Sequence, residues 1–205
     1  MIVVIESSNA HKYPDLMDQM FQTRARVFRD RMRWDVTVER GRERDKYDDE
    51  TPVYILWTDE KCQNVKGSLR LLPTTGPTVL ADFFADTIPD AALLSAPSIW
   101  ECTRFCLNER QVENPLFAST LLTVALGELA LSAGIQTIVA NFDPAMLRLY
   151  KLMGCEVELL GYTHRFERPV YLGSFPISDT HLRKLKRGLN DPRSLGSARA
   201  EVLAA

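Results

Sequence analysis

The sequence has little of what a disulfide-bonded or metal-binding protein needs. Only four cysteines occur in 205 residues, Cys62, Cys102, Cys106 and Cys155, and only one pair is closely spaced. This is too few for a zinc knuckle, and with no leader segment we expect reduced thiols and a cytoplasmic location. The three histidines lie far apart in the chain, so we expect no metal site.

A basic leader and a long uninterrupted apolar run are also missing. The chain starts MIVVIESSNA, which has no basic segment and only a short apolar run. The longest apolar stretch, from Leu116 to Ala133, is diluted by polar residues such as Glu128. This pattern favours a buried core helix over a membrane span, so we expect no membrane association.

An excess of basic charge is missing as well. Lys and Arg number 25 against 27 Asp and Glu, which gives a net charge of −2. Nucleic-acid binding needs a concentrated basic face, and only the arginine run from Arg24 to Arg33 favours it, so we expect none. The length and the 45% apolar content suit one soluble domain, which we expect over 1–189, with a flexible tail over 190–205.

Hydrophobic patterning predicts a mixed α/β fold. Strands are expected at 2–5, 53–58, 65–72, 98–107, 135–140, 156–160, 162–166 and 170–175, and helices at about 14–31, 115–133, 144–153 and 182–189. Asn114-Pro115 and Asp143-Pro144 provide the N-terminal caps of two of these helices. The strand–helix–strand unit through 98–140 predicts two parallel strands, and the whole order predicts a mixed sheet flanked by helices.

The most unusual segment is ERGRERDKYDDE at 39–50, in which six acids interleave with four bases. In most proteins such a run is solvated surface. Here arginines in apolar settings elsewhere in the chain need counter-charges: Arg24, Arg70 and Arg104. Carboxylates such as Asp45 and Asp48 bind an ammonium, whereas arginines bind a carboxylate in bidentate fashion, so together they could hold an amino-acid head group.

Glu101 stands between Trp100 and Cys102 in a strand-like run. A half-buried carboxylate is costly unless it is paired, so one interpretation is a buried ion pair with Arg104 or Arg70. The other is a general base whose pKa is set by burial near a cation. Strict alternation puts Glu101 and Arg104 on opposite faces, so either a bulge lies between them or they serve different sides of the sheet.

These residues and their spacing resemble the LuxI-type acyl-homoserine lactone synthase (autoinducer synthase) family over about 1–161. Four separated blocks carry the resemblance: Arg24, Phe28 and Trp34; Glu43-Arg44-Asp45 with Asp48; GSLRLLPTTGP at 67–77, which contains Arg70; and Trp100-Glu101 with Arg104-Phe105. The resemblance implies a GNAT-like mixed sheet with a V-shaped split, flanked by helices in three α-β-α layers.

The resemblance also implies a reaction between an acyl carrier protein thioester and S-adenosylmethionine (SAM). The SAM amine attacks the thioester to form an amide, and the methionyl carboxylate then attacks its own γ-carbon and expels methylthioadenosine. SAM is a substrate here, and no cofactor is implied. The acyl carrier protein is the only protein partner expected.

The acyl donor has an alternative, acyl-CoA, with this chain acting as a lactone synthase or as a GNAT-type N-acyltransferase. CoA-dependent enzymes of the GNAT fold usually hold the pyrophosphate in a glycine-rich loop before a helix. The matching segment here, CLNERQVENPLF at 106–117, has no glycine. Its composition favours a donor without a pyrophosphate, such as a pantetheine carried on a protein.

The family implies roles for individual residues. Glu101 is the expected base, and Arg104 and Arg24 are expected to hold the SAM carboxylate. The SAM site is expected to comprise Phe28, Trp34, Asp45, Asp48, Arg70, Arg104 and Phe105, with Phe28 and Trp34 as walls or as core residues. Arg70 is expected to tie the N-terminal loop to the sheet, and 39–50 to act as a lid that orders on SAM binding.

The acyl pocket is expected among later elements, at Leu122, Leu126, Thr137, Ile138, Met146, Leu149 and Leu152. Carrier-protein docking needs a basic face, because carrier proteins are acidic. One basic set is Arg148, Lys151, Arg165 and Arg168. A second set is Arg183, Lys184, Lys186 and Arg187. Each set can equally be an ordinary solvated face.

Overall fold

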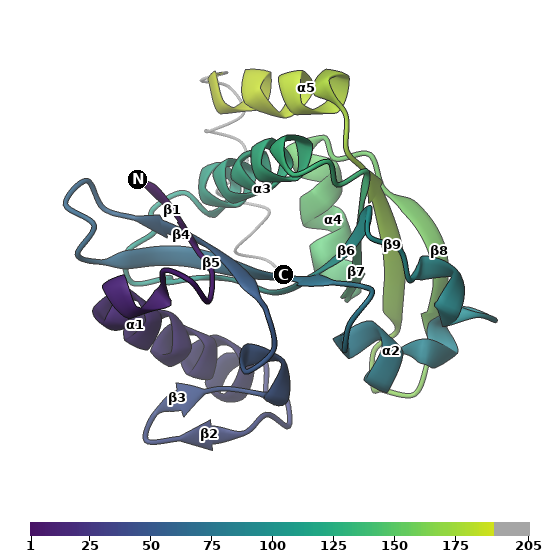
Figure 1. The fold of residues 1–205 in the computed structure, drawn as a ribbon, viewed down its shortest axis with the longest axis horizontal. Coiled ribbons are helices and arrows are strands. Elements are labelled where there is room, and N and C mark those ends of the chain that lie inside the picture. Colours follow the sequence, from purple (N-terminus) through teal and green to yellow (C-terminus); the bar gives the residue numbers. More distant parts are fainter. Residues whose placement is uncertain (191–205) are drawn as a thin grey trace.

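A computed structural model describes residues 1–190 and is built on one seven-stranded sheet (Figure 1). The strands are β1 (Ile2–Ile5), β4 (Val53–Thr58), β5 (Val65–Pro73), β6 (Ile99–Leu107), β7 (Thr137–Phe142), β8 (Glu158–Thr163) and β9 (Val170–Pro176). Their order in the sheet is β1-β4-β5-β6-β7-β9-β8. The β6–β7 pair is parallel and its neighbours in the sheet are antiparallel, which confirms the predicted parallel unit.

Helices cover both faces of the sheet. On one face lies α1 (Pro14–Arg24), which continues into a π-helical segment, η2 (Ala25–Arg31). The other face is covered by α3 (Pro115–Ser132), α4 (Pro144–Met153) and α5 (Asp179–Asn190), as Figure 1 shows. The predicted three-layer α-β-α arrangement is therefore confirmed.

Capping side chains fix where α3 and α4 begin. The Asn114 side chain accepts a hydrogen bond from the Phe117 N–H, and the Asp143 side chain accepts one from the Met146 N–H. A proline follows each cap at the first helical position, where its missing N–H costs nothing. At the other end of α4, Gly154 adopts a φ of 79°, a conformation that favours glycine. Both predicted N-caps are confirmed.

Several elements differ from the prediction. The expected loop at 39–50 contains a small hairpin, β2 (Val38–Glu39) with β3 (Arg42–Glu43), and a 3₁₀ turn, η3 (Lys46–Asp48). A short helix, α2 (Val79–Phe83), and the 3₁₀ turns η4 (Ala85–Thr87) and η5 (Ala91–Leu94) fill a region that had no predicted element. They are too short to show helical periodicity in the sequence.

The two strands expected on either side of Gly161 are one strand, β8, with a bulge near that residue. A Cβ on Gly161 would lie 1.8 Å from the carbonyl oxygen of Thr87 in η4. The glycine is therefore required for a close contact with η4 and does not mark a turn, which is why the sequence pattern was wrong here.

The larger core lies between the sheet and helices α3, α4 and α5, and a smaller one lies beneath α1. Within residues 1–190, only α3 has the length and composition to cross a membrane, and 56% of it is buried inside the protein. It packs as a core helix, as its polar interruptions predicted. The tail expected at 190–205 lies outside the described residues, except for Asn190 at the end of α5.

Candidate active site

A β-bulge in β6 brings Arg104 close to Arg70. In the β5–β6 ladder Arg70 pairs with Thr103, whereas Ser68 pairs with Cys106, so β6 has one extra residue between these pairs. Arg104 sits in this bulge with a φ of 53°, in the left-handed region that costs a non-glycine residue about 1 kcal/mol. Of the two predicted alternatives, the structure has the bulge. Arg104 and Arg70 consequently bind a common partner, Asp45.

Three arginines and three acids form one charge-balanced network. Arg70 binds Asp45 through two nitrogens at 2.5 and 3.0 Å and Asp48 at 2.8 Å. Arg24 binds both oxygens of Asp48, at 2.7 and 2.8 Å. The predicted tie between Arg70 and the N-terminal loop is confirmed.

Glu43 is the third acid of this network. Its carboxylate accepts from Arg24 Nε at 2.5 Å and from Arg104 at 2.9 and 3.1 Å. Arg104 also donates to Asp45 at 2.8 Å. Only Asp45 and Asp48 were predicted to face inward, because charge alternation does not show which acids of a run do so.

Most of the network is sealed from solvent. The side chains of Arg24, Glu43, Arg70 and Asp48 are fully buried. Burial opposes ionisation of Asp48, but hydrogen bonds and charge from Arg24, with the charge of Arg70, hold the pKa of Asp48 well below its usual range. All donors of Arg24 that are described point to acids, so in this arrangement Arg24 positions the acids and has no surface facing a ligand.

Local hydrogen bonds explain why Asp45 and Asp48 turn inward. Asp45 caps η3 by accepting from the Tyr47 N–H, and Asp48 accepts from the Asp45 N–H, which is a reciprocal capping box. The Tyr54 hydroxyl donates to Asp48 at 2.7 Å. These bonds and the ion pairs hold this part of 39–50 in place, so any lid motion would have to break buried ion pairs. The lid itself stays a prediction.

The network reaches solvent through Asp45 and Arg104, whose side chains are 19% and 13% exposed. Beside them Phe28 stacks on Trp34 with ring centroids 5.1 Å apart, and the Arg104 guanidinium lies 5.3 Å from the Phe28 centroid. A carboxylate, a guanidinium and the exposed ring of Trp34, which stacks on the buried Phe28, thus share one open surface. This set of groups suits a cationic ligand that also carries a carboxylate.

Glu101 lies at the edge of this site and is 1% exposed. Its two carboxylate oxygens accept hydrogen bonds from the Leu80 N–H at 2.7 Å and the Val79 N–H at 2.9 Å, both at the start of α2. Burial raises the pKa of Glu101 to about 7, against the opposing effect of these N–H groups and of the Arg70 and Arg104 charges. A carboxyl that titrates near neutrality suits a general base.

The sheet splits directly after Glu101. The last described β6–β7 pair joins Glu101 to Val139, and β7 continues alone along β9 while β6 enters its bulge. Two strands that diverge in this way leave backbone groups facing a V-shaped gap. Glu101 therefore sits at the vertex of the split.

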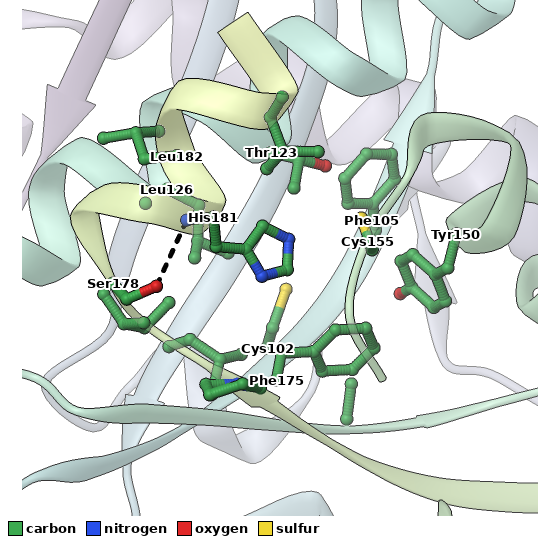
Figure 2. A pocket seen from close by; sticks show the side chains of 16 residues that line it. Cys102, Phe105, Thr123, Leu126, Tyr150, Cys155, Phe175, Ser178, His181 and Leu182 are labelled. Carbon is green, nitrogen blue, oxygen red and sulfur yellow. Dashed lines mark hydrogen bonds between the residues drawn. The ribbon is translucent and has the colours of Figure 1, made fainter. Parts of the chain in front are cut away.

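A narrow cavity of about 60 Å³ lies on the opposite face of the sheet, beneath α5. Figure 2 shows side chains converging on it from β6, α3, α4, β9 and α5. Its lining is almost entirely apolar and includes Cys102, the neighbour of Glu101. This shape and chemistry suit a hydrocarbon chain.

The expected acyl residues are only partly brought together. Leu126 and Ile138 line the cavity, and so does Phe105, which was expected at the SAM site. Leu122, Met146 and Leu149 belong to the surrounding core. Thr137 is half-buried in β7 and outside the lining, and Leu152 is 46% exposed at the surface.

The cavity residues Thr123, Tyr150, Phe175 and His181 were not predicted. They come from four different elements, so no spacing along the chain links them. The backbone N–H groups of α2 that bind Glu101 were not predicted either, because a five-residue helix leaves no periodic signal in the sequence.

The expected docking residues are all exposed. Arg148 and Lys151 lie on α4, and Arg165 and Arg168 follow β8. Arg165 is also tied to the Phe83 carbonyl. The second set, Arg183, Lys184, Lys186 and Arg187, forms the outer side of α5, whose Leu182 and Leu185 belong to the core. Within residues 1–190, no group of His, Cys, Asp and Glu residues could hold a metal ion.

Comparisons with known proteins agree with this arrangement. The family model described as autoinducer synthase matches residues 8–185. An acyl-homoserine-lactone synthase of Rhizobium etli is 38% identical over 176 residues, which covers 84% of this chain and 82% of that protein.

Solved structures are similar over nearly the whole chain. A CoA-dependent acyl-homoserine lactone synthase, BjaI, solved with SAM and isopentyl-CoA, superposes with a TM-score of 0.81 at 28% identity, covering 94% of this chain and 90% of that one. A putative N-acetyltransferase from Lactobacillus plantarum shares the fold, with a TM-score of 0.57 at 16% identity over 86% of this chain and 99% of that one. The GNAT-like class of the fold is thereby confirmed.

Proposed function

This chain belongs to the autoinducer synthase family and is an acyl-homoserine-lactone synthase, and from that premise we propose which residues carry the reaction and which donor supplies the acyl group. SAM is the amine substrate of this activity. The observation that carries the proposal is the position of Glu101, a buried carboxyl with a pKa near 7, between the ion network and the apolar cavity.

In this proposal SAM binds at the open edge of the network. Its ammonium faces Asp45, its carboxylate faces Arg104, and its sulfonium and adenosine lie against Trp34, which Phe28 supports from behind. The partial exposure of Asp45 and Arg104 supports this, because the other network members have no free surface. Arg24, Glu43, Asp48 and Arg70 act as positioning residues that fix the two contacting groups.

Acylation needs an uncharged amine. Glu101 accepts a proton from the SAM ammonium, directly or through one water, and the amine then attacks the thioester carbonyl. The carbonyl oxygen becomes an oxyanion, which a backbone N–H of β6 beyond the last β6–β7 pair stabilises. When this intermediate collapses, the C–S bond breaks, the donor leaves as a thiol with a proton from the attacking nitrogen, and the amide remains. The split of the sheet supports this step, because it frees strand backbone beside Glu101.

Lactonisation needs positioning more than acid–base chemistry. The sulfonium is already a good leaving group, so the enzyme has to hold the carboxylate close to the γ-carbon. Arg104 is suited to this task, since its guanidinium is held by Glu43 and Asp45 and stacks on Phe28. The carboxylate then displaces methylthioadenosine, and the acyl-homoserine lactone leaves.

The acyl chain occupies the cavity beneath α5, and the proposed donor is an acyl carrier protein thioester. The segment between β6 and α3 has no glycine to wrap a pyrophosphate, and exposed arginines and lysines on α4 and after β8 suit an acidic carrier. Acyl-CoA is the second candidate, favoured by the similarity to BjaI, which is CoA-dependent. We place the reaction in the cytoplasm, where the thiols of the four free cysteines stay reduced.

Paired donors test this proposal. The purified protein is supplied with SAM and with one acyl group, carried either on an acyl carrier protein or on CoA, and methylthioadenosine release is measured. We expect a higher kcat/KM with the carrier protein, and a further loss with that donor alone when Arg148 and Lys151 are changed to Glu. Equal or higher kcat/KM with CoA would contradict the choice of donor.

A further inference from the structure

A histidine side chain enters the largely apolar cavity from α5, the helix that covers it. His181 lies in the first turn of α5, and Figure 2 shows its ring projecting into the cavity near Cys102 and Thr123. The side chain is 8% exposed, so the ring is effectively out of water. The packing of α5 on α3 fixes its position, since Gly127 of α3 leaves room for Leu182.

The two ring nitrogens of His181 are in different situations. Nε2 accepts a hydrogen bond from the Glu156 N–H at 3.3 Å, so in the neutral ring the proton is on Nδ1. Nδ1 is buried and has no hydrogen-bond partner within residues 1–190. The closest acid oxygen, on the half-exposed Glu156 side chain, lies 3.9 Å away, beyond hydrogen-bond range.

Burial keeps this ring neutral. It lowers the pKa of His181, against the opposing effect of the Glu156 charge. The cavity thus contains a neutral N–H donor without an acceptor. Leaving such a donor unpaired in an apolar site is costly, so a ligand that supplies a hydrogen-bond acceptor binds more tightly than one that does not.

From this geometry we infer that His181 determines acyl specificity: its Nδ1–H binds an oxygen on the acyl chain, and the enzyme selects a chain with a hydroxyl or keto group over the plain hydrocarbon. The inference rests on the proposed acyl site beneath α5. It extends that site by assigning a polar substituent to the chain and one side chain to its recognition.

Matched acyl donors test the inference. All share one carrier and one chain length; one is unsubstituted, and the others place a single hydroxyl or keto oxygen at successive carbons. The measured quantity is the ratio of kcat/KM values, from methylthioadenosine release. We expect at least one oxygenated donor to exceed the unsubstituted one by about 5-fold or more, the value of one buried hydrogen bond.

Two variants separate recognition from packing. His181→Leu keeps the volume and removes the donor, so the ratio should fall to about 1. His181→Asn keeps an N–H donor near the position of Nδ1, so the preference should largely remain. Thermal unfolding establishes that each variant is folded, and the wild-type ratio is informative even where a variant does not fold.

Two results overturn the inference alone. One is turnover of all donors by the wild type with no preference for oxygen, as expected if water satisfies Nδ1. The other is an unchanged preference in folded His181→Leu. Absence of methylthioadenosine release with every donor would instead overturn the proposed function, and the inference with it.

Discussion

Replacing Glu101 by Gln perturbs the proposed base while keeping its size. In the wild type both carboxylate oxygens accept backbone N–H bonds, from Leu80 at 2.7 Å and from Val79 at 2.9 Å. Gln has one oxygen, so its NH₂ group would face one of these N–H donors. The variant therefore removes the base and leaves one N–H unpaired.

The loss of the base lowers the rate, and the unpaired N–H lowers the stability. A positioned general base contributes roughly 10²–10⁴-fold, so kcat for lactone formation should fall by about that factor. An unpaired buried N–H costs about 1–3 kcal/mol, so the free energy of unfolding should fall by about that amount. SAM affinity should fall much less than kcat, because Asp45, Arg104 and Trp34 keep their proposed contacts with SAM in this variant.

The pH dependence follows from the raised pKa. The carboxylate form is the active base, so wild-type kcat/KM should rise as pH increases through about 7 and then level off. Glu101→Gln should lack this limb. Stability depends on pH in the opposite direction, because the folded state binds the Glu101 proton more tightly than the unfolded state does. The resulting contribution to the free energy of unfolding is fully present below about pH 4.5 and is lost as pH rises through about 7.

Thr78→Ala is the matched control, because Glu101 also anchors α2. Thr78 caps α2 by accepting from the Ala81 N–H at 3.1 Å, so its loss weakens the same helix by about 1 kcal/mol without touching the carboxyl. We expect this variant to keep the pH limb and most of its activity. Unchanged turnover in Glu101→Gln, or an equal loss in Thr78→Ala, would refute the assignment of Glu101 as base.

Three further changes test the network, the cavity and the fold. Arg70→Ala removes one buried partner from Asp45 and from Asp48, which keep Arg104 and Arg24 as ion-pair partners, so urea unfolding should show a loss of about 3 kcal/mol; a loss below about 1 kcal/mol would mean that Arg70 contributes little to the network. Ala140→Leu places a larger side chain in the cavity, so mass spectrometry should show shorter acyl chains in the lactones, and an unchanged chain distribution would move the acyl site elsewhere. Gly161→Ala forces a Cβ against the Thr87 carbonyl and should cost about 1–3 kcal/mol in thermal unfolding; an unchanged Tm would show that η4 yields freely.

Local signals in the sequence predicted much of the fold. The caps at Asn114 and Asp143, each followed by proline, and the alternation of apolar strands gave the helices and strands around the site. The parallel β6–β7 unit followed from chain connectivity. What failed was structure held by distant contacts, such as Gly161 against η4.

The site was predictable where residue type alone decides the chemistry. Arginines in apolar strands need acids, which pointed to Asp45 and Asp48. The inward position of Glu43 was not predicted, because nothing in an alternating run of charges shows which third acid faces inward. The cavity was not predicted, because its lining comes from several elements and depends on how they pack together, which no single strand or helix encodes.

The order of product release tests the central claim most directly. Purified protein is mixed with an acyl carrier thioester and SAM in a single turnover, and the free carrier thiol and methylthioadenosine are measured over time. If one site carries acylation and then lactonisation, the thiol forms first, and both products finish in equal amounts with the lactone. Release of methylthioadenosine before the thiol, or at the same rate without an acyl donor, would contradict the account.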